Sequence, residues 1–347
     1  MNGSSKIAVL QRLLSPLSPL YQGGAALRAS LYQKKILPSK GLPKPVISVG
    51  NLTTGGSGKT PLVIEIVQRF SGEGLRSAVL SRGYRGNSRA PVNLVSDTTR
   101  ILMDAAGAGD EPFLMARKLP GTPVITGKDR YTAGMEALQR FEIDLFLLDD
   151  GFQHLPLKRE MNILLMDGQN PFGSGRCLPG GDLREGPSAL RRADLILFAG
   201  SPAEADRNHI HRLAPRASFH SVRFEATGVT DLGLKPAAPL SFLKGKTLFA
   251  FAGIARPGRF YETLEQVGVI LQGRRSFPDH HNYRPEELRA LLNEGKDRQA
   301  EGLITTEKDA VRITSFPAGL PLHVLQLGVI LDNPKDFLQE VRRKTGV

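Results

Sequence analysis

The stretch Val46-Ile47-Ser48-Val49-Gly50-Asn51-Leu52-Thr53-Thr54-Gly55-Gly56-Ser57-Gly58-Lys59-Thr60-Pro61 decides the fold of this 347-residue chain. Its apolar start predicts a buried strand, and the residues from Pro61 onward predict a helix. Between the two, glycines let backbone N–H groups turn toward phosphate oxygens, Lys59 is placed to reach the outer phosphates, and the Thr60 hydroxyl can bind Mg²⁺. The stretch therefore predicts a nucleoside triphosphate site built from Thr53, Thr54, Gly55, Gly56, Ser57, Gly58, Lys59 and Thr60.

The loop departs from the general phosphate-loop pattern at one position. Thr53 stands where that pattern has its first glycine, five residues before Gly58. A glycine-rich turn that happens to contain Gly-Lys-Thr is therefore the alternative interpretation. The apolar strand before the loop and the helix after it favour the phosphate site, and Pro61 suits the first turn of a helix because its missing N–H costs nothing there.

Length and composition indicate a globular protein with about two domains. The hydrophobic content of 40% and the charged content of 23% are typical of soluble proteins and exclude a disordered chain. One cysteine, Cys177, cannot form an internal disulfide and fits a reducing compartment. The neighbourhood of His209 and His211 contains no further cysteine or clustered carboxylates, so we expect these histidines at the surface and not in a zinc site.

The net charge of +12 is concentrated near the start of the chain, where residues 1–64 contain no acid. Residues 1–36 combine basic side chains with leucines at helical spacing, interrupted by Pro16 and Pro19. Three interpretations remain open for this segment: an amphipathic anchor on an anionic membrane surface, a pair of packing helices, or an organellar transit peptide.

No stretch is apolar for long enough to predict a membrane-spanning helix. A nucleic-acid partner is not expected, because aromatic residues make up only 6% of the chain and the basic residues lie beside leucines instead of stacking residues.

Beyond the first strand, apolar runs alternate with helical patterns, which predicts an α/β fold: a P-loop NTPase-type layered domain with a mostly parallel sheet, followed by a smaller C-terminal α/β domain. The predicted ranges are 37–202 for the P-loop domain, 203–239 for a linker without a long periodic pattern, and 240–347 for the smaller domain. Predicted strands cover 77–80, 92–95, 123–126, 143–148, 162–166, 194–198, 246–253, 302–305 and 322–327; predicted helices cover 111–118, 131–140, 259–267, 285–293 and 334–343.

The strand predicted over 143–148 ends in the acids Asp149 and Asp150. A P-loop site needs a carboxylate on the metal side, at the end of a neighbouring strand. The pair is therefore predicted to bind Mg²⁺, although paired acids at a strand end also occur as ordinary turn or helix caps.

Phosphoryl transfer to an alcohol also needs a group that takes the hydroxyl proton. Asp110, in Gly109-Asp110-Glu111-Pro112, and the histidines of Pro278-Asp279-His280-His281 are candidates. From the residues alone they cannot be paired, and Asp110 as a helix cap and the histidines as ordinary loop residues remain alternatives. Asp110 and His280 fall in different predicted domains, so we expect that closure of a cleft brings them together.

Basic residues in further loops could hold a second anionic group. Arg82, Lys128 and Arg130 follow predicted strands, and ligands bind at the carboxyl edge of open parallel sheets. Solvated turns are the alternative at each of these positions.

Taken together, these motifs resemble the tetraacyldisaccharide 4′-kinase family of lipid A biosynthesis. The resemblance covers the chain in order, from Leu13-Leu14-Ser15-Pro16-Leu17 through the phosphate loop, which lacks the first glycine in that family as well. The other motifs that carry it are Ser81-Arg82-Gly83-Tyr84, Gly109-Asp110-Glu111-Pro112, Leu148-Asp149-Asp150-Gly151-Phe152-Gln153-His154, Leu183-Arg184-Glu185, Phe251-Ala252-Gly253-Ile254-Ala255, Pro278-Asp279-His280 and Thr306-Glu307-Lys308-Asp309-Ala310.

The resemblance implies a kinase that moves the γ-phosphate of ATP to the 4′-hydroxyl of an acylated, 1-phosphorylated glucosamine disaccharide, as a peripheral protein on the cytoplasmic face of the inner membrane. It implies Asp110 and His280 as the catalytic pair, with Lys59 on the phosphates. It also implies Thr60, Asp149, Asp150 and Glu185 near Mg²⁺, and it favours membrane contact by residues 1–36.

Two rival functions are retained. A membrane-surface ATPase switch often carries a second lysine near the front of this loop, where Thr54 stands here, and it has no evident use for His280. A soluble small-molecule kinase would not need the leucine-rich, acid-free start.

Overall fold

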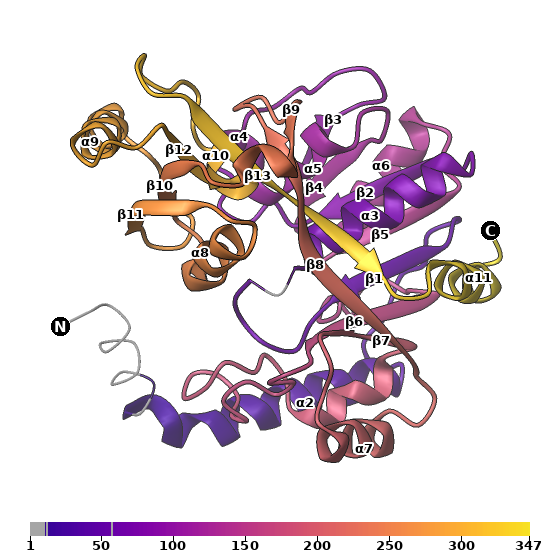
Figure 1. The fold of residues 1–347 in the computed structure, drawn as a ribbon. Helices are drawn as coiled ribbons and strands as arrows, with labels where there is room; N and C mark the ends of the chain where they lie inside the picture. Colours follow the sequence, from indigo (N-terminus) through magenta and orange to yellow (C-terminus); the bar gives the residue numbers. More distant parts are fainter. Residues whose placement is uncertain (1–10, 12, 57) are drawn as a thin grey trace. The chain divides into compact units, whose positions relative to one another are not determined.

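The fold was analysed in a computed structural model, which describes residues 11, 13–56 and 58–347 (Figure 1). The chain forms two compact units, each built from separated segments. The first unit takes its described residues from the ranges 11–82, 129–223 and 331–347, and the second unit combines residues 83–128 and 224–330. The domain ranges predicted from the sequence were continuous, whereas these units alternate along the chain.

The first unit is built on a parallel sheet. Its strands lie in the order β7 (Leu195–Ala199), β6 (Met161–Asp167), β1 (Val46–Gly50), β5 (Leu145–Asp149) and β2 (Ser77–Ser81). The first residues of β8 (Ser218–Thr230) extend the sheet beside β7, also in parallel. Every residue of β1, β2 and β5 is buried, which explains why these strands read as continuous apolar runs.

Helices cover this sheet. α3 (Lys59–Gly72) packs on β1, β2 and β5, α6 (Arg130–Arg140) packs on β2, and α11 (Pro334–Thr345) packs on β6 (Figure 1). α3 buries Leu62, Val63, Ile66, Val67 and Phe70 along one side, as its helical spacing requires.

Two glycines allow the turn after β5 to lie close to β1. A Cβ atom on Gly50 would come within 2.5 Å of the Phe152 Cβ, and one on Gly151 would come within 2.4 Å of the Leu148 Cγ. The acids that end β5 are thereby held beside the strand that leads into the phosphate loop.

The second unit contains another parallel group of strands, in the order β11 (Ile270–Ser276), β10 (Thr247–Ala252), β12 (Gly302–Thr306) and β13 (Leu322–Leu331). α8 (Pro257–Gln266) and α9 (Pro285–Asp297) pack on this group. β3 (Val92–Ser96) and β4 (Val124–Gly127) pair in antiparallel fashion and contact α5 (Asp110–Lys118), which in turn contacts α10 (Glu307–Ala310).

The N-terminal segment is only partly described. After the 3₁₀ turn η1 (Ser15–Leu17), the helix α2 (Ser18–Gln33) runs with Pro19 in its first turn. The predicted interruption at the two prolines therefore falls at η1, while Ile7, Leu10 and Arg12 lie outside the described residues. Within the part of the chain that the structure describes, no helix is both long and apolar enough to cross a membrane.

The structure corrects one expectation about regular structure. The stretch 203–239, predicted as a linker, contains α7 (Glu204–Leu213), β9 (Pro236–Pro239) and the whole of β8, which is the longest strand among the described residues. α7 carries Ile210 as its only fully buried residue, and residues 223–227 of β8 are mostly not buried, so neither element has the apolar periodicity that predicts it. The short elements α4 (Ala105–Ala108), η2 (Pro187–Arg192) and η3 (Leu240–Leu243) were not predicted either.

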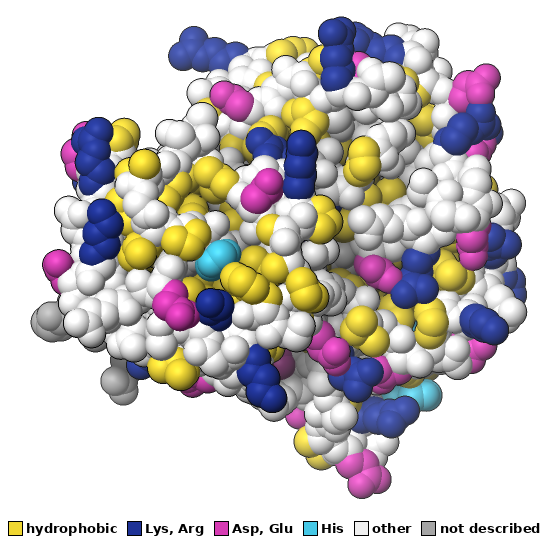
Figure 2. Space-filling view, turned by 45° about the horizontal axis from the view of Figure 1, so that its top comes forward, with side chains coloured by type: hydrophobic (Ala, Val, Ile, Leu, Met, Phe, Trp, Pro, Cys, Tyr) yellow, Lys and Arg dark blue, Asp and Glu magenta, His cyan; other side chains and the backbone are white. Residues whose placement is uncertain are grey.

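Charged side chains are dispersed on the face drawn in Figure 2. There, Lys and Arg side chains alternate with Asp and Glu and with apolar patches, and they do not gather in one basic area. A single basic surface of the kind that binds nucleic acid is not visible on this face.

Candidate functional site

The loop between β1 and α3 has the backbone of a phosphate cradle. Gly55 and Gly58 have positive φ angles of 98° and 88°, a conformation that favours glycine. Lys59 is the first residue of α3, and the buried Thr60 follows it. The N-terminus of a helix directed at the loop offers N–H groups to an anion. Ser57, which the sequence also assigns to this site, lies outside the described residues.

Lys59 connects this loop to the end of β5. Its Nζ atom lies 2.9 Å from Asn51 Oδ1 and 3.4 Å from Asp150 Oδ1. Asn51 in turn donates from Nδ2 to the carbonyl of Thr53, at 2.7 Å. The lysine is therefore held by one residue that precedes the loop and by one that follows β5.

The two acids at the end of β5 have different surroundings. Asp149 is 1% exposed, and Ser81 Oγ donates to its Oδ2 at 3.5 Å. Asp150 turns out of the strand with a positive φ of 50° and accepts from Arg184 at 2.7 Å. Burial by itself would raise the pKa of Asp150, but the charges of Lys59 and Arg184 outweigh it and lower the pKa. Asp150 is thus held as a carboxylate.

A third acid, Glu185, lies in the loop that closes against the phosphate loop. The backbone N–H of Thr54 donates to Asp182 O, and that of Arg184 donates to Leu52 O, both at 2.7 Å. The buried Glu185 carboxylate accepts from Arg192 and from Gln153 Nε2, the latter at 3.5 Å. The fold thus places the segment that carries Glu185 against the phosphate loop, which leads into Lys59.

The carboxylates of this region do not form a ready-made metal cage. Among the residues that the structure describes, no group of three or more His, Cys, Asp or Glu side chains could hold a metal ion. Mg²⁺ in nucleotide sites takes one or two protein carboxylates, a hydroxyl, waters and phosphate oxygens, so the donor set of Thr60 with Asp149 fits that ion when a triphosphate supplies the rest.

The basic residues predicted to hold a second anion lie in two units. Arg130, at the start of α6, is buried, and its burial followed by the charge of Arg82 lowers its pKa to about 10. Arg130 also lies 3.4 Å from His154 Nδ1. Arg82 and Arg130 belong to the first unit, whereas the exposed Lys128 belongs to the second.

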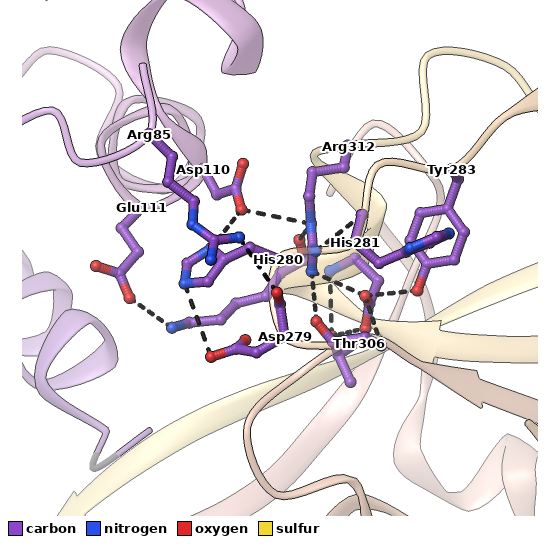
Figure 3. A network of polar contacts seen from close by, with 12 residues as sticks. Arg85, Asp110, Glu111, Asp279, His280, His281, Tyr283, Thr306 and Arg312 are labelled. Carbon is purple, nitrogen blue, oxygen red and sulfur yellow. Dashed lines mark hydrogen bonds and ion pairs between the residues drawn. The ribbon is translucent and has the colours of Figure 1, made fainter. Parts of the chain in front are cut away.

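The second unit contains the other candidate pair (Figure 3). His280 Nδ1 lies 2.8 Å from Asp110 Oδ2, although 170 residues separate them in the sequence. Asp110 is the first residue of α5, whose cap is Gly109, so the alternative that Asp110 caps the helix is wrong. His281 instead contacts Glu287, through its Nε2 at 3.1 Å from the carboxylate.

Asp110 and His280 belong to the same compact unit. The expectation that they lie in different domains is therefore wrong, because residues 83–128 leave the first unit and join the second. The hydrogen bond between them forms inside one unit. Sequence reasoning could not find this, since nothing in the local pattern shows that α5 packs with the later segment.

Several residues that shape these sites were not predicted. Asn51, Gln153, Arg184 and Arg192 hold Lys59, Asp150 and Glu185 through hydrogen bonds. Asn51, Gln153 and Arg184 lie inside the motifs quoted from the sequence, and this position was the only sign in the sequence that they belong to the sites. Arg192, at the end of η2, had none.

Comparison with known proteins gives a consistent result over the whole chain. The family model for tetraacyldisaccharide-1-P 4′-kinase matches residues 10–345. A tetraacyldisaccharide 4′-kinase of Pelobacter propionicus is 41% identical over 341 residues, which cover 96% of this chain and 92% of the relative. Another, of Geobacter metallireducens, is 44% identical over 301 residues, with 87% and 88% covered.

The fold is similar to a solved structure as well. The crystal structure of the "apo" form of LpxK from Aquifex aeolicus, in complex with ATP, superposes with a TM-score of 0.77 at 31% sequence identity. The match covers 97% of this chain and 99% of that one.

Proposed function

Because the chain belongs to the family of tetraacyldisaccharide-1-P 4′-kinases, we propose that its two sets of site residues divide the transfer of the ATP γ-phosphate between them. The acceptor is the 4′-hydroxyl of a tetraacyl glucosamine disaccharide 1-phosphate, an intermediate of lipid A biosynthesis. An ATPase switch and a soluble small-molecule kinase, the two rival functions, are not favoured by this family membership.

The first unit binds the donor. The loop from Thr53 to Thr60 surrounds the phosphates of ATP with backbone N–H groups, and Lys59 neutralises the charge that develops on the transferred group. The contact of 3.4 Å between Lys59 and Asp150 supports this role, because it keeps the ammonium group over the loop in the free protein. Lysine can leave this carboxylate for the stronger charge of a triphosphate.

Mg²⁺ would be held by the Thr60 hydroxyl and Asp149, with Asp150 and Glu185 as further acids on the metal side. When bound, the ion supplies charge neutralisation between the phosphates. Arg184 fixes Asp150, and Arg192 and Gln153 fix Glu185, so the carboxylates are oriented by residues of the same unit.

The pair in the second unit activates the acceptor. A neutral His280 that donates from Nδ1 to Asp110 keeps Nε2 as an acceptor for the proton of the sugar hydroxyl. As the new bond from the 4′-oxygen to the γ-phosphorus forms and the bond to the β-phosphate oxygen breaks, the hydroxyl proton passes to Nε2 and ADP leaves. The single observation that carries this assignment is the 2.8 Å contact between His280 and Asp110.

Arg82 and Arg130 of the first unit are proposed to hold the lipid phosphate, and Lys128 of the second unit is proposed as a separate substrate contact. All three follow strands, at the edge where ligands bind in open parallel sheets. The influence of Arg82 on the pKa of Arg130 supports a shared anion site for these two residues, since an anion between them would relieve their mutual repulsion.

The N-terminal segment is proposed to bring the enzyme to the cytoplasmic face of the inner membrane. α2 is tied to the rest of the first unit by Ser18, whose Oγ accepts from Gly180 N at 2.9 Å, and by Arg28, which donates to Gln153 O at 3.2 Å. Leu13, Leu17, Leu20 and Leu27 are exposed, and Leu20 and Leu27 lie seven residues apart on one face of α2. Exposed leucines on a basic segment support contact with an anionic bilayer, where the acylated substrate resides.

The assignment is tested by measuring phosphate transfer from ATP with Mg²⁺ to a tetraacyl disaccharide 1-phosphate in detergent micelles. Lys59→Ala, Asp110→Ala and His280→Ala should each lower kcat by about 10²-fold or more, since general-base catalysis and charge neutralisation each contribute on that scale.

His281→Ala is the matched control for His280→Ala, because it removes the neighbouring imidazole that contacts Glu287 instead of Asp110. If Asp110→Ala turns over as fast as the unaltered enzyme, the assignment of Asp110 and His280 as the catalytic pair is wrong. Turnover of Lys59→Ala at that level would remove the donor site.

A further inference from the structure

The motif Thr306-Glu307-Lys308-Asp309-Ala310 has no part in the reaction as described so far. It forms the last residue of β12 and the short helix α10, and Arg312 lies two positions after it, behind Val311. Asp309 is 0% exposed, and the side chain of Arg312 is 3% exposed. Burying charges is costly unless they are paired and hydrogen-bonded, so the contacts of these two residues show what they hold in place.

Arg312 binds the loop that carries His280 (Figure 3). Its Nη1 donates to the carbonyl of His281 at 3.0 Å, and its Nη2 donates to the carbonyl of Gly253 at 3.1 Å. The Gly253 carbonyl also accepts the backbone N–H of His280, at 3.1 Å. The planar guanidinium group therefore fixes two carbonyl groups: that of Gly253, which accepts the His280 N–H, and that of His281, the next residue.

Asp309 holds Arg312 and contacts the same loop through Tyr283. Its Oδ1 accepts from Arg312 at 2.8 Å, from Gly253 N at 2.9 Å and from the Tyr283 hydroxyl at 2.7 Å. Its Oδ2 accepts from Thr306 Oγ1 at 2.6 Å. Burial, and then the charge of Asp309, raise the pKa of Tyr283, which favours the protonated hydroxyl that donates to Asp309.

The backbone of His280 needs such support. Its φ of 61° lies in the left-handed region, which is unfavourable for a residue with a side chain and persists only where neighbours enforce it. Arg312 holds the carbonyl of the next residue, His281, and the Gly253 carbonyl that accepts the His280 N–H, while Asp309 holds Tyr283 further along the loop. Gly253 leaves little room at the junction, since a Cβ there would lie 3.0 to 3.1 Å from Tyr283, Asp309 and His281.

The same segment also contacts the partner of His280. Arg312 Nε lies 3.5 Å from Asp110 Oδ2, while it donates to Lys308 O at 2.9 Å. Two ion pairs join α10 to α5, the helix that Asp110 begins: Lys308 with Glu111 and Lys118 with Glu307, both at 2.6 Å. The charge order is reversed between the two pairs, which specifies one alignment of the two helices.

We propose that Arg312, held by Asp309, is the positioning residue that sets His280 against Asp110. Its guanidinium group contacts Asp110, Asp309, the carbonyl of His281 and the Gly253 carbonyl that accepts the His280 N–H. Its effect on turnover rests on the catalytic role proposed for the Asp110 and His280 pair, whereas its effect on the geometry of His280 does not.

The test uses Arg312→Lys in the full-length chain. Lysine keeps the charge but replaces the fork by one nitrogen, which cannot bind Gly253 O, His281 O and Asp309 together. We expect kcat to fall about 10²-fold, the scale of a misplaced catalytic group, with an unchanged KM for ATP. The imidazole NMR signals of His280, assigned with His280→Gln, should lose the signature of the Nδ1 hydrogen bond.

Arg298→Ala is the control, because it removes a surface guanidinium group that donates to Gln272 O in the same unit. This substitution should change neither kcat nor the His280 signals.

Three further outcomes decide the role. Guanidinium ions at a concentration that leaves the fold intact should restore turnover to Arg312→Ala, and urea at the same concentration should not. In an Asp110→Ala background, Arg312→Lys should lower kcat only slightly further. The effects of substitutions at residues that act as one unit do not add. Unchanged His280 signals in Arg312→Lys, or a full additional loss in that background, would overturn the proposal. If Asp110→Ala alone keeps its turnover, the hypothesis that Asp110 and His280 form a catalytic pair is wrong. The NMR signals of His280 then still show whether Arg312 positions this histidine.

Discussion

His154 illustrates how the first unit alters the chemistry of a single residue. It follows the acids of β5 by four positions, its backbone carbonyl accepts from Arg159 at 2.7 Å, and its Nδ1 lies 3.4 Å from Arg130. Burial, followed by the charges of Arg130 and Arg159, lowers its pKa to about 4 from the ordinary 6.5. The imidazole is therefore neutral in the folded chain at neutral pH.

This shift predicts a pH dependence of stability. Between pH 6.5 and about 4 the unfolded chain binds a proton at His154 that the folded chain does not, so the free energy of unfolding falls as the pH is lowered through this window. Above pH 6.5 the contribution is complete and constant. Urea unfolding at pH 5 and pH 7.5 measures the difference, which should be smaller in His154→Asn.

His209→Asn serves as the control, because His209 is exposed on α7 and meets Phe172 only through a ring contact. An identical pH difference in His154→Asn and the unaltered chain would show that His154 does not carry the effect.

At the residue scale, the sequence predicted the members of the phosphate loop and the strand-end acids from spacing, because their chemistry depends on neighbours along the chain. It did not predict Arg312 or Arg192, since these residues act through contacts with segments far away in sequence. The choice of His280 over His281 came from a family resemblance, and the different partners of the two histidines agree with it.

At the scale of elements, α2 has the most direct consequence. Leu20 is 74% exposed and Leu27 is 62% exposed, two turns apart on the helix. Leu20→Glu together with Leu27→Glu should weaken cosedimentation with vesicles that contain anionic lipids by about tenfold or more, since each leucine loses about 1.5–3 kcal/mol of burial.

Gln22→Glu together with Gln33→Glu makes the same change of charge at polar, exposed positions of α2 and is the matched control. If both double variants lose binding equally, the loss reflects charge alone, and the leucines are not the membrane contact. Vesicle binding that survives both changes would place the contact elsewhere in the chain.

Elements with a buried apolar face were predictable, and elements without one were not. β1, β2 and β5 are apolar along their whole length and were predicted to within two residues. β11 exposes Ile270, Arg274, Arg275 and Ser276, and in β8 residues 223–227 alternate between exposed and partly buried, with none of them fully buried. Their positions are determined by pairing with β10 and β7, which no local pattern records.

At the scale of the whole molecule, the proposed function assigns ATP binding to the first unit and acceptor activation to the second. ATP at about 100 times its Kd should stabilise the folded chain by about 2.7 kcal/mol through binding alone. Thermal unfolding should show this shift in the unaltered chain and in Asp110→Ala, and no shift in Lys59→Ala. A shift that is lost in Asp110→Ala as well would contradict the assignment of ATP binding to the first unit.

The α/β class and the mostly parallel sheets were predicted correctly from the alternation of apolar runs and helices. The interleaving of the two units was not predicted, because composition changes little where the chain passes from one unit to the other, near residues 82, 128, 223 and 331. β8 continues across one of these positions as a single strand, so no break in regular structure reveals it.

α11 gives this interleaving a consequence for biosynthesis. The helix packs on β6, and its Glu340 accepts from Ser218 Oγ at 2.5 Å and contacts His220 at 3.1 Å, all within the first unit. A ribosome that has made the phosphate loop must still translate more than two hundred residues before these partners exist. The first unit is therefore completed only after translation passes residue 331, and it cannot fold in full as an early N-terminal domain does while the rest of a chain is being made.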